Sequence, residues 1–170
     1  RYADDFVITG DKEELLSKMV KPLVEQFLFQ RGLSLSTEKT RISHINDGFD
    51  FLGFNIRKYG NKLLTKPAKS SIASVREKIK GIITANKTAR TDNLIGKLNP
   101  VIRGWGYYYR HVVSQKTFDR IDTAIWRMTW KWAKRRHLNK PLKWIKTKYF
   151  QSKGSRRWVF CEKNSKLELL

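Results

Sequence analysis

The first residues of the chain carry the side chains best suited to metal chemistry. Asp4 and Asp5 are adjacent carboxylates in a predicted tight turn, which joins Tyr2-Ala3 to the β-rich run at residues 6–9. Mg²⁺ prefers oxygen ligands, and a short hairpin fixes the direction in which two carboxylates point. Nucleotidyl transfer needs such a site, because two ions about 4 Å apart activate a hydroxyl and stabilise a leaving group. Adjacent aspartates also occur in ordinary turns, so the pair alone leaves both interpretations open.

The charge of the chain is distributed unevenly. The 170 residues carry a net charge of +21. Residues 1–56 hold seven basic and nine acidic side chains, a net charge of −2, whereas residues 57–170 hold 29 basic and six acidic ones, a net charge of +23. All six tryptophans lie in the second part. Because basic and aromatic side chains together are typical of surfaces that bind phosphates and exposed bases, the second part is predicted to bind a polyanion.

Residues 1–65 are predicted to mix strands with one helix. The helix begins after a cap at Asp11, runs to about residue 30, is kinked or divided by Pro22 and ends at Gly32. Alternating apolar residues and turn signals predict strands at residues 6–9, 33–36, 41–45, 49–56 and 63–65. A turn at residues 59–62 is predicted to reverse the chain between the last two strands.

After Pro67 the apolar period changes from two to about 3.6 residues. This period predicts three helices, at residues 70–85, from residue 91 through Trp105, and at residues 118–136, with Pro100 bending the second. Their lengths and short connections favour a three-helix bundle. Residues 138–170 are predicted to form a basic tail with aromatic anchors at Trp144, Tyr149, Phe150 and Trp158.

Four motifs in order resemble a group II intron reverse transcriptase/maturase. The acidic turn has the Tyr-Ala-Asp-Asp form that these enzymes favour. Residues 32–40 resemble the palm motif that follows that turn by one helix, and residues 48–54 resemble a hairpin near the primer terminus. Residues 94–136 resemble the maturase-specific thumb. The resemblance covers essentially the whole chain, and four ordered motifs are far more specific than any one of them.

The resemblance implies an α+β fold in three parts. Residues 1–65 would form the end of a polymerase palm, built of β-hairpins and a helix. Residues 66–137 would form an all-α, three-helix thumb bundle, and residues 138–170 a basic C-terminal extension. The family's site also uses a third aspartate on an earlier palm strand and fingers that bind the nucleotide, and neither is encoded here. We therefore expect a fragment of an RNA-directed DNA polymerase that does not polymerise by itself.

The resemblance also assigns roles to individual residues. Asp4 matches a direct ligand of Mg²⁺, and Asp5 matches its partner with a weaker or indirect metal role. Lys39 matches a lysine proposed in some polymerases to protonate the leaving pyrophosphate, and a surface lysine after a strand is the equal alternative. The residues expected near the primer or the nucleotide are Tyr2, Ala3, Phe51, Leu52 and Gly53.

The basic helices are predicted to grip nucleic acid. Residues 127–148 contain no acidic side chain, whereas solvated helix faces usually mix the two signs. Binding through phosphates would be strong and steeply dependent on salt. The cations expected to contact nucleic acid are Lys66, Arg103, Arg110, Lys116, Arg127, Lys131, Lys134 and Arg135. Trp126 and Trp130 share a flank of the third helix, where packing between helices is favoured over base stacking.

The expected partners are group II intron RNA, an RNA template with its DNA primer, and target DNA. Mg²⁺ is the expected cofactor, in a two-ion site whose third carboxylate lies outside this chain. Zinc is not expected, because His44, His111 and His137 lack metal-ligand spacing and Cys161 is the single cysteine. No apolar run approaches the ~20 residues that span a bilayer, so no membrane partner is expected.

Two other interpretations stay open beside the polymerase. A non-enzymatic RNA-binding maturase or splicing factor would use the basic helices without Asp4 or Asp5. A generic basic DNA-binding domain would explain the charge of residues 57–170 but would leave residues 1–56 without a purpose. A bacterial-type cytoplasmic location in association with RNA or the nucleoid is expected in either case, because the chain opens with no signal-peptide pattern.

Overall fold

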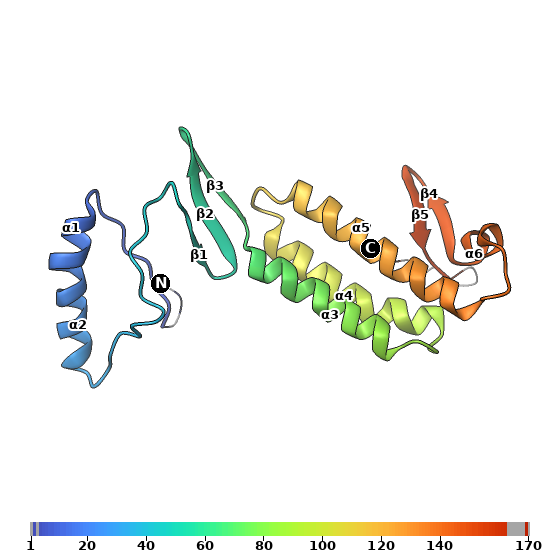
Figure 1. The fold of residues 1–170 in the computed structure, drawn as a ribbon, viewed down its shortest axis with the longest axis horizontal. Coiled ribbons are helices and arrows are strands. Elements are labelled where there is room, and N and C mark those ends of the chain that lie inside the picture. The colour runs from blue at the N-terminus through green and yellow to red at the C-terminus, as the bar shows by residue number, and fades with distance from the viewer. Residues whose placement is uncertain (1, 3, 163–168, 170) are drawn as a thin grey trace.

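A computed structural model describes residues 2, 4–162 and 169 of the chain. Its elements follow one another along an elongated molecule (Figure 1). A helical segment lies at one end, a small sheet follows it, three long helices come next, and a short helix with a two-stranded sheet lies at the other end. The α+β class predicted from the sequence is confirmed.

The predicted first helix is continuous but changes its winding before Pro22. It consists of α1 (Glu13–Leu15), the π-helical segment η1 (Leu16–Val20) and α2 (Lys21–Phe29). Proline lacks an amide hydrogen, and its ring collides with the carbonyl four residues earlier in an α-helix. The wider π turn directly before Pro22 removes that conflict. The interruption predicted at Pro22 is therefore a local change of winding, and the two helical pieces are not divided.

Three of the predicted strands are absent. Residues 6–9, 33–36 and 41–45 have no strand pairing, and near the N-terminus the described β-structure is a single bridge between Tyr2 and Asp5. A strand is stable when a neighbouring strand accepts its backbone hydrogen bonds. In the described residues, residues 6–9 and 33–36 have no such neighbour. Residues 41–45 have one contact of this kind, from the amide of Lys58 to the carbonyl of Ile45 at 2.9 Å, which is not enough to form a strand. The strand predictions for these three segments were wrong.

The central sheet is antiparallel in the order β1-β2-β3, with β1 (Phe49–Phe51), β2 (Phe54–Tyr59) and β3 (Lys62–Pro67). The single strand predicted at residues 49–56 is two strands, because Leu52 and Gly53 turn the chain with φ values of 49° and 78°. Two left-handed residues in a row are the geometry of a tight two-residue hairpin. The turn predicted at residues 59–62 is confirmed, with Tyr59 paired to Lys62.

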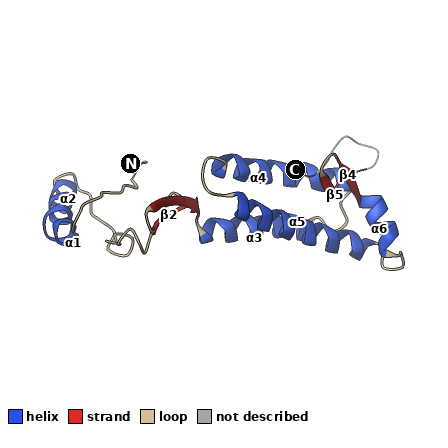
Figure 2. Cartoon of the chain, turned by 90° about the horizontal axis from the view of Figure 1, so that it is seen from above, coloured by secondary structure: helices blue, strands red, loops and turns tan. Residues whose placement is uncertain are grey.

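The three-helix bundle predicted after Pro67 is confirmed. It consists of α3 (Lys69–Ala85), α4 (Thr91–Tyr109) and α5 (Gln115–Arg136), which run side by side along the molecule (Figure 2). Helix α4 continues through Pro100. The fully buried centre of the bundle is aliphatic and includes Ile79, Leu94, Ile95 and Leu98. Within the described ranges, no helix combines the length and apolar character that crossing a bilayer requires.

The predicted basic tail is a folded unit, which corrects the sequence prediction. It contains α6 (Leu142–Tyr149) and a hairpin of β4 (Phe150–Lys153) and β5 (Arg156–Phe160). The rings of Phe150 and Phe160 pack 5.4 Å from Trp130 and 5.7 Å from Trp132 respectively. The expected aromatic anchors thus extend the bundle core, and this burial stabilises elements too short for periodicity to predict. Residues 163–168 and 170 lie outside the described residues.

Candidate active-site turn and nucleic-acid interface

The acidic turn is closed by two backbone hydrogen bonds. The amide of Tyr2 donates to the carbonyl of Asp5 at 2.8 Å, and the amide of Asp5 donates to the carbonyl of Tyr2 at 2.9 Å. This pairing closes a tight turn in which the side chains of Asp4 and Asp5 are both exposed. Ala3, also expected in this site, lies outside the described residues.

The donor set of the turn fits a hard cation in part. Carboxylate oxygens are the ligands that Mg²⁺ prefers. In the part of the chain that the structure describes, no hydrogen bond or ion pair occupies the carboxylates of Asp4 and Asp5, and no three His, Cys, Asp or Glu side chains gather as a metal site. Asp4 and Asp5 therefore offer two of the carboxylates that a two-ion centre needs.

Lys39 is not held against the acidic turn. It lies exposed in the turn at residues 37–39, which the amide of Thr40 closes by donating to the carbonyl of Ser36 at 2.9 Å. No contact between its ammonium and Asp4 or Asp5 is present among the described residues. Its predicted role in protonating a leaving group stays a prediction.

The hairpin tip formed by Phe51, Leu52 and Gly53 is docked on the end of α4. The hydroxyl of Tyr108 donates to the carbonyl of Leu52 at 2.8 Å, and the hydroxyl of Tyr109 donates to the carbonyl of Gly53 at 2.9 Å. A side chain on Gly53 would come within 2.7 Å of the Tyr109 hydroxyl, so this close approach requires glycine. The residues predicted to lie near a primer thus also join the sheet to the bundle.

Aromatic rings complete this joint from the bundle side. Phe54 lies 5.0 Å from both Tyr108 and Tyr109, and Trp105 lies 4.7 Å from Tyr109. Ser71 of α3 hydrogen-bonds the Tyr109 hydroxyl at 2.6 Å. The sequence prediction assigned no role to these tyrosines, although three consecutive tyrosines at the end of a helix were a visible signal.

The environment of the joint also acts on Tyr108. The pKa of Tyr108 is raised above its ordinary value, first by desolvation and then by the negative charges that Tyr109 and Tyr2 would carry when ionised.

Most of the predicted cations on α5 form one exposed stripe. Side chains at intervals of three, four and seven residues lie on the same face of a helix. The stripe, called the basic stripe below, consists of Lys116, Arg120, Arg127, Lys131 and Lys134, all exposed. Arg135 lies on its flank. The opposite face of α5 carries the buried residues Ile121, Ile125 and Trp132, so packing of the core directs the cations outward.

The other predicted cations lie on two further surfaces. Arg103 of α4 and Arg110, the residue directly after that helix, are both exposed, and the guanidinium of Arg110 lies 5.0 Å from the Tyr107 ring. Lys66 belongs to the central sheet, where its ammonium lies 4.3 Å from the ring of Tyr59. The structure therefore brings together the α5 cations and divides the remainder between α4 and the sheet.

Comparison with known protein families identifies the family of both the acidic turn and the helical bundle. Residues 1–56 match the family model for reverse transcriptase (RNA-dependent DNA polymerase), and residues 72–150 match the model for the group II intron, maturase-specific domain. The chain belongs to the group II intron reverse transcriptase/maturase family. No curated protein matches the sequence. The reverse transcriptase match covers the acidic turn, and the maturase-specific match covers the bundle through α6.

The tryptophans of the maturase-specific domain make contacts with other aromatic rings of the protein. Trp126 stacks on Trp130 with ring centroids 6.0 Å apart, and both rings contact Trp158 of β5, at 5.9 Å and 5.7 Å. The ammonium of Lys146 lies 4.0 Å from the Trp158 ring. Both rings therefore pack within the protein, as favoured from the sequence, but against β5 and each other rather than between helices, and Trp126 is 36% exposed.

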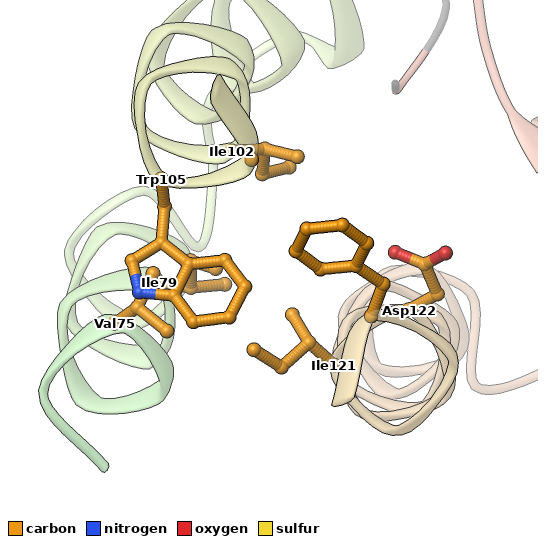
Figure 3. A pocket seen from close by; sticks show the side chains of 8 residues that line it. Val75, Ile79, Ile102, Trp105, Ile121 and Asp122 are labelled. Atoms are coloured by element: carbon orange, nitrogen blue, oxygen red, sulfur yellow. The ribbon is translucent and has the colours of Figure 1, made fainter. Parts of the chain in front are cut away.

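A cavity of about 200 Å³ lies between the three helices of the maturase-specific domain (Figure 3). Its lining is largely apolar and includes Trp105, Phe118 and Ile121, with Asp122 at the edge. Burial raises the pKa of Asp122 above its ordinary value, a nearby Arg156 opposes that change, and Asp119 adds to it. The cavity lacks the converging polar groups of a nucleotide site, so it is a packing gap in the bundle.

Proposed function

We propose that the chain binds group II intron RNA through its maturase-specific domain, aids splicing, and contributes two carboxylates to RNA-directed DNA synthesis. The observation that carries this proposal is the basic stripe, a row of exposed cations on one face of a well-packed helix. Within the described residues, no ion pair neutralises the stripe. An RNA backbone supplies the missing negative charge.

The energetics of such a surface come mainly from counterion release. Each phosphate that a cation neutralises releases condensed ions, so affinity falls steeply as salt is added. The rigid bundle presents the cations at fixed spacing because the opposite face of α5 is buried. Arg103 and Arg110 on α4 and Lys66 on the sheet add further positive charge. Suitable partners are intron RNA, an RNA template with its DNA primer, and target DNA.

The acidic turn supplies the polymerase side of the proposal. Asp4 would hold Mg²⁺ directly, with Asp5 as its partner, and the bound metal would supply Lewis-acid stabilisation of negative charge during nucleotidyl transfer. Tyr2 would line the region next to the primer. Because both carboxylates of the turn are exposed, they are open to a nucleic-acid end rather than packed in the protein core.

The RNA-binding part is tested on this chain with two matched double variants. R127A/K131A removes two cations from the basic stripe, whereas K12A/K18A removes the same charge from the helical segment before α2. We expect the first variant to bind a group II intron transcript more weakly and to reduce the slope of log Kd against log salt concentration by about two. Equal losses in both variants would contradict a role for the stripe.

The polymerase part is tested by joining this chain to the fingers and upstream palm of a group II intron reverse transcriptase. Primer extension on an RNA template is then compared between the joined protein and its Asp4→Ala variant. We expect synthesis to fall by orders of magnitude with unchanged RNA binding, because the metal loses a ligand and the stripe is intact. Undiminished synthesis in the variant would refute the assignment of Asp4.

A second candidate function is a non-enzymatic maturase. It is favoured by the separation of the basic stripe from the acidic turn, since the stripe needs neither carboxylate for its geometry. This function predicts that Asp4→Ala leaves intron splicing unchanged in a splicing assay. Loss of splicing together with synthesis would show instead that the two activities depend on one site.

A further inference from the structure

The corner between α5 and α6 surrounds one imidazole with cations and aromatic rings. The ring of His137 lies 4.8 Å from Trp144, edge to face, and its Nε2 hydrogen-bonds the Tyr149 hydroxyl at 2.7 Å. The ammonium of Lys148 lies 4.8 Å from the Trp144 centroid, and that of Lys140 lies 5.6 Å from it. The term "α5–α6 corner" refers below to these five residues.

Arg136 lies next to this corner and is held by contacts with other parts of the bundle. Its guanidinium donates to the carbonyl of Ala89 at 2.6 Å and lies 4.6 Å from the Trp132 ring. Arg136 follows Lys134 by two residues, which is about 200° around the helix, so it points away from the basic stripe. The α5–α6 corner is therefore a different surface from the stripe.

The corner is accessible and carries an excess of positive charge. Trp144 is 36% exposed, and the side chains of Lys140 and Lys148 are exposed. Residues 127–148 contain no Asp or Glu. Burial raises the pKa of Tyr149 above its ordinary value, the charge and hydrogen bond of Arg136 oppose that rise, and the carboxylate of Glu162 adds a smaller contribution to it. Within the described residues, no ion pair involves Lys140 or Lys148.

The surroundings of His137 disfavour its charged form. Its pKa is lowered below the ordinary value, first by desolvation and then by the positive charges of Lys148, Arg136 and Lys140. An anion held among these cations would cancel part of their field and would favour the imidazolium form. In that form Nε2–H donates to the Tyr149 hydroxyl, and Nδ1–H is a second donor, which makes no hydrogen bond within the described chain.

We propose that the α5–α6 corner binds one phosphate and one adjacent base of a single-stranded RNA, with uptake of a proton by His137. Lys140 and Lys148 turn from the indole to the phosphate, and the base replaces them on the exposed face of Trp144. His137 donates through Nδ1 to the same phosphate. The site is additional to the RNA contact proposed for the basic stripe, and it takes only the class of its ligand from that function.

The pH dependence has a definite sign. Binding of phosphate raises the pKa of His137, so the complex holds more protons than the free protein does. Affinity therefore increases as pH falls through the higher pKa of the imidazole in the complex, and it levels off below the pKa of the free imidazole, which lies below its ordinary value. Because a tenfold change in affinity corresponds to about one pKa unit between free and bound forms, we expect Kd to tighten about three- to tenfold from pH 7.5 to pH 5.5.

The test uses the full chain, an eight-nucleotide oligouridylate and its thymidylate counterpart. Kd is measured at both pH values for the unaltered protein, His137→Gln, Trp144→Ala, K140A/K148A and the charge-matched control K12A/K18A. The imidazole of His137 is followed by NMR with and without oligouridylate and with inorganic phosphate alone. Circular dichroism confirms that each variant is folded, and K140A/K148A alters only exposed side chains.

Three results support the proposal: a rise in the pKa of His137 on adding oligouridylate, loss of the pH dependence in His137→Gln, and a greater loss of affinity in K140A/K148A than in K12A/K18A. A His137 resonance that does not respond to either ligand overturns it, as does equal weakening in the two lysine variants. A response to phosphate without any loss in Trp144→Ala overturns the stacked base. Failure of R127A/K131A alone would refute the basic stripe and leave the corner intact.

Discussion

Residues 4–66 and residues 68–162 use similar apolar side chains in opposite ways. In the second region Ile79, Leu94 and Leu98 are completely buried. In the first region Leu23 is 67% exposed and Phe29 is 82% exposed, and the described buried hydrophobic core begins only at Ala68. Helical periodicity is therefore not sufficient for a core, because an apolar face stabilises a helix only when another element covers it.

The two regions meet at the docked hairpin. The amide of Ala68 donates to the carbonyl of Gly53 at 2.8 Å, and the amide of Val113 donates to the carbonyl of Thr65 at 3.0 Å. Together with the hydroxyls of Tyr108 and Tyr109, these bonds attach the sheet to the bundle. The central sheet thus takes its order from the three-helix bundle rather than from a core of its own.

The largest expected difference between the regions is in hydrogen exchange. Amides in the centres of α3, α4 and α5 should exchange only through global unfolding, with protection of about 5–15 kcal/mol. Amides of η1 and α2 should open at close to zero cost, since these segments bury no residue. Mass spectrometry of deuterated peptides measures both. Equal protection of α2 and α4 would remove the contrast between the two regions.

A large-to-small substitution should separate the regions next. Leu98→Ala is expected to lower the free energy of unfolding by about 2–5 kcal/mol, because it leaves a cavity in a fully buried site. Leu23→Ala, on the exposed face of α2, should change it by less than about 0.5 kcal/mol. Urea denaturation followed by circular dichroism measures both values. A cost for Leu23→Ala as large as that for Leu98→Ala would reveal a core that the fold does not show.

Two glycines with positive φ sharpen the comparison at the joint. Gly53→Ala should destabilise the protein by about 1–3 kcal/mol, because strain at a φ of 78° adds to a contact of 2.7 Å with the Tyr109 hydroxyl. Gly60→Ala has a φ of 57° but open space around it, so the cost should be about 1 kcal/mol. Urea denaturation measures both. If Gly60→Ala lowered the free energy of unfolding more than Gly53→Ala, the docking contact at Gly53 would not contribute to stability.

The smallest expected effect concerns one hydroxyl. Tyr108→Phe removes the donor to the Leu52 carbonyl and should cost about 0.5–1.5 kcal/mol, measured by thermal unfolding. Tyr107→Phe keeps the ring that contacts Arg110 and should be neutral. A cost for the Tyr107 variant equal to that of Tyr108→Phe would show that the hairpin is held by ring packing alone.

The sequence by itself determined the features that depend on local spacing. The 3.6-residue period placed α3, α4 and α5 within a few residues of their observed ends, because a helix satisfies its own backbone and needs only one apolar face. The Tyr2–Asp5 turn was equally local, since its closing hydrogen bonds lie within four residues. The row of cations on α5 followed directly from these positions.

Tertiary structure decided everything that needed a distant partner. Alternation predicted strands at residues 6–9, 33–36 and 41–45, but a strand needs a run of hydrogen bonds to a neighbour, and in the described chain only the carbonyl of Ile45 receives one, from the amide of Lys58. The C-terminal elements are ordered by burial of Phe150 and Phe160 against α5. Such short segments are not predictable from the periodicity of their apolar residues. The α5–α6 corner likewise exists because packing of Tyr149 brings α6 beside His137, so the environment of that imidazole is a property of the fold.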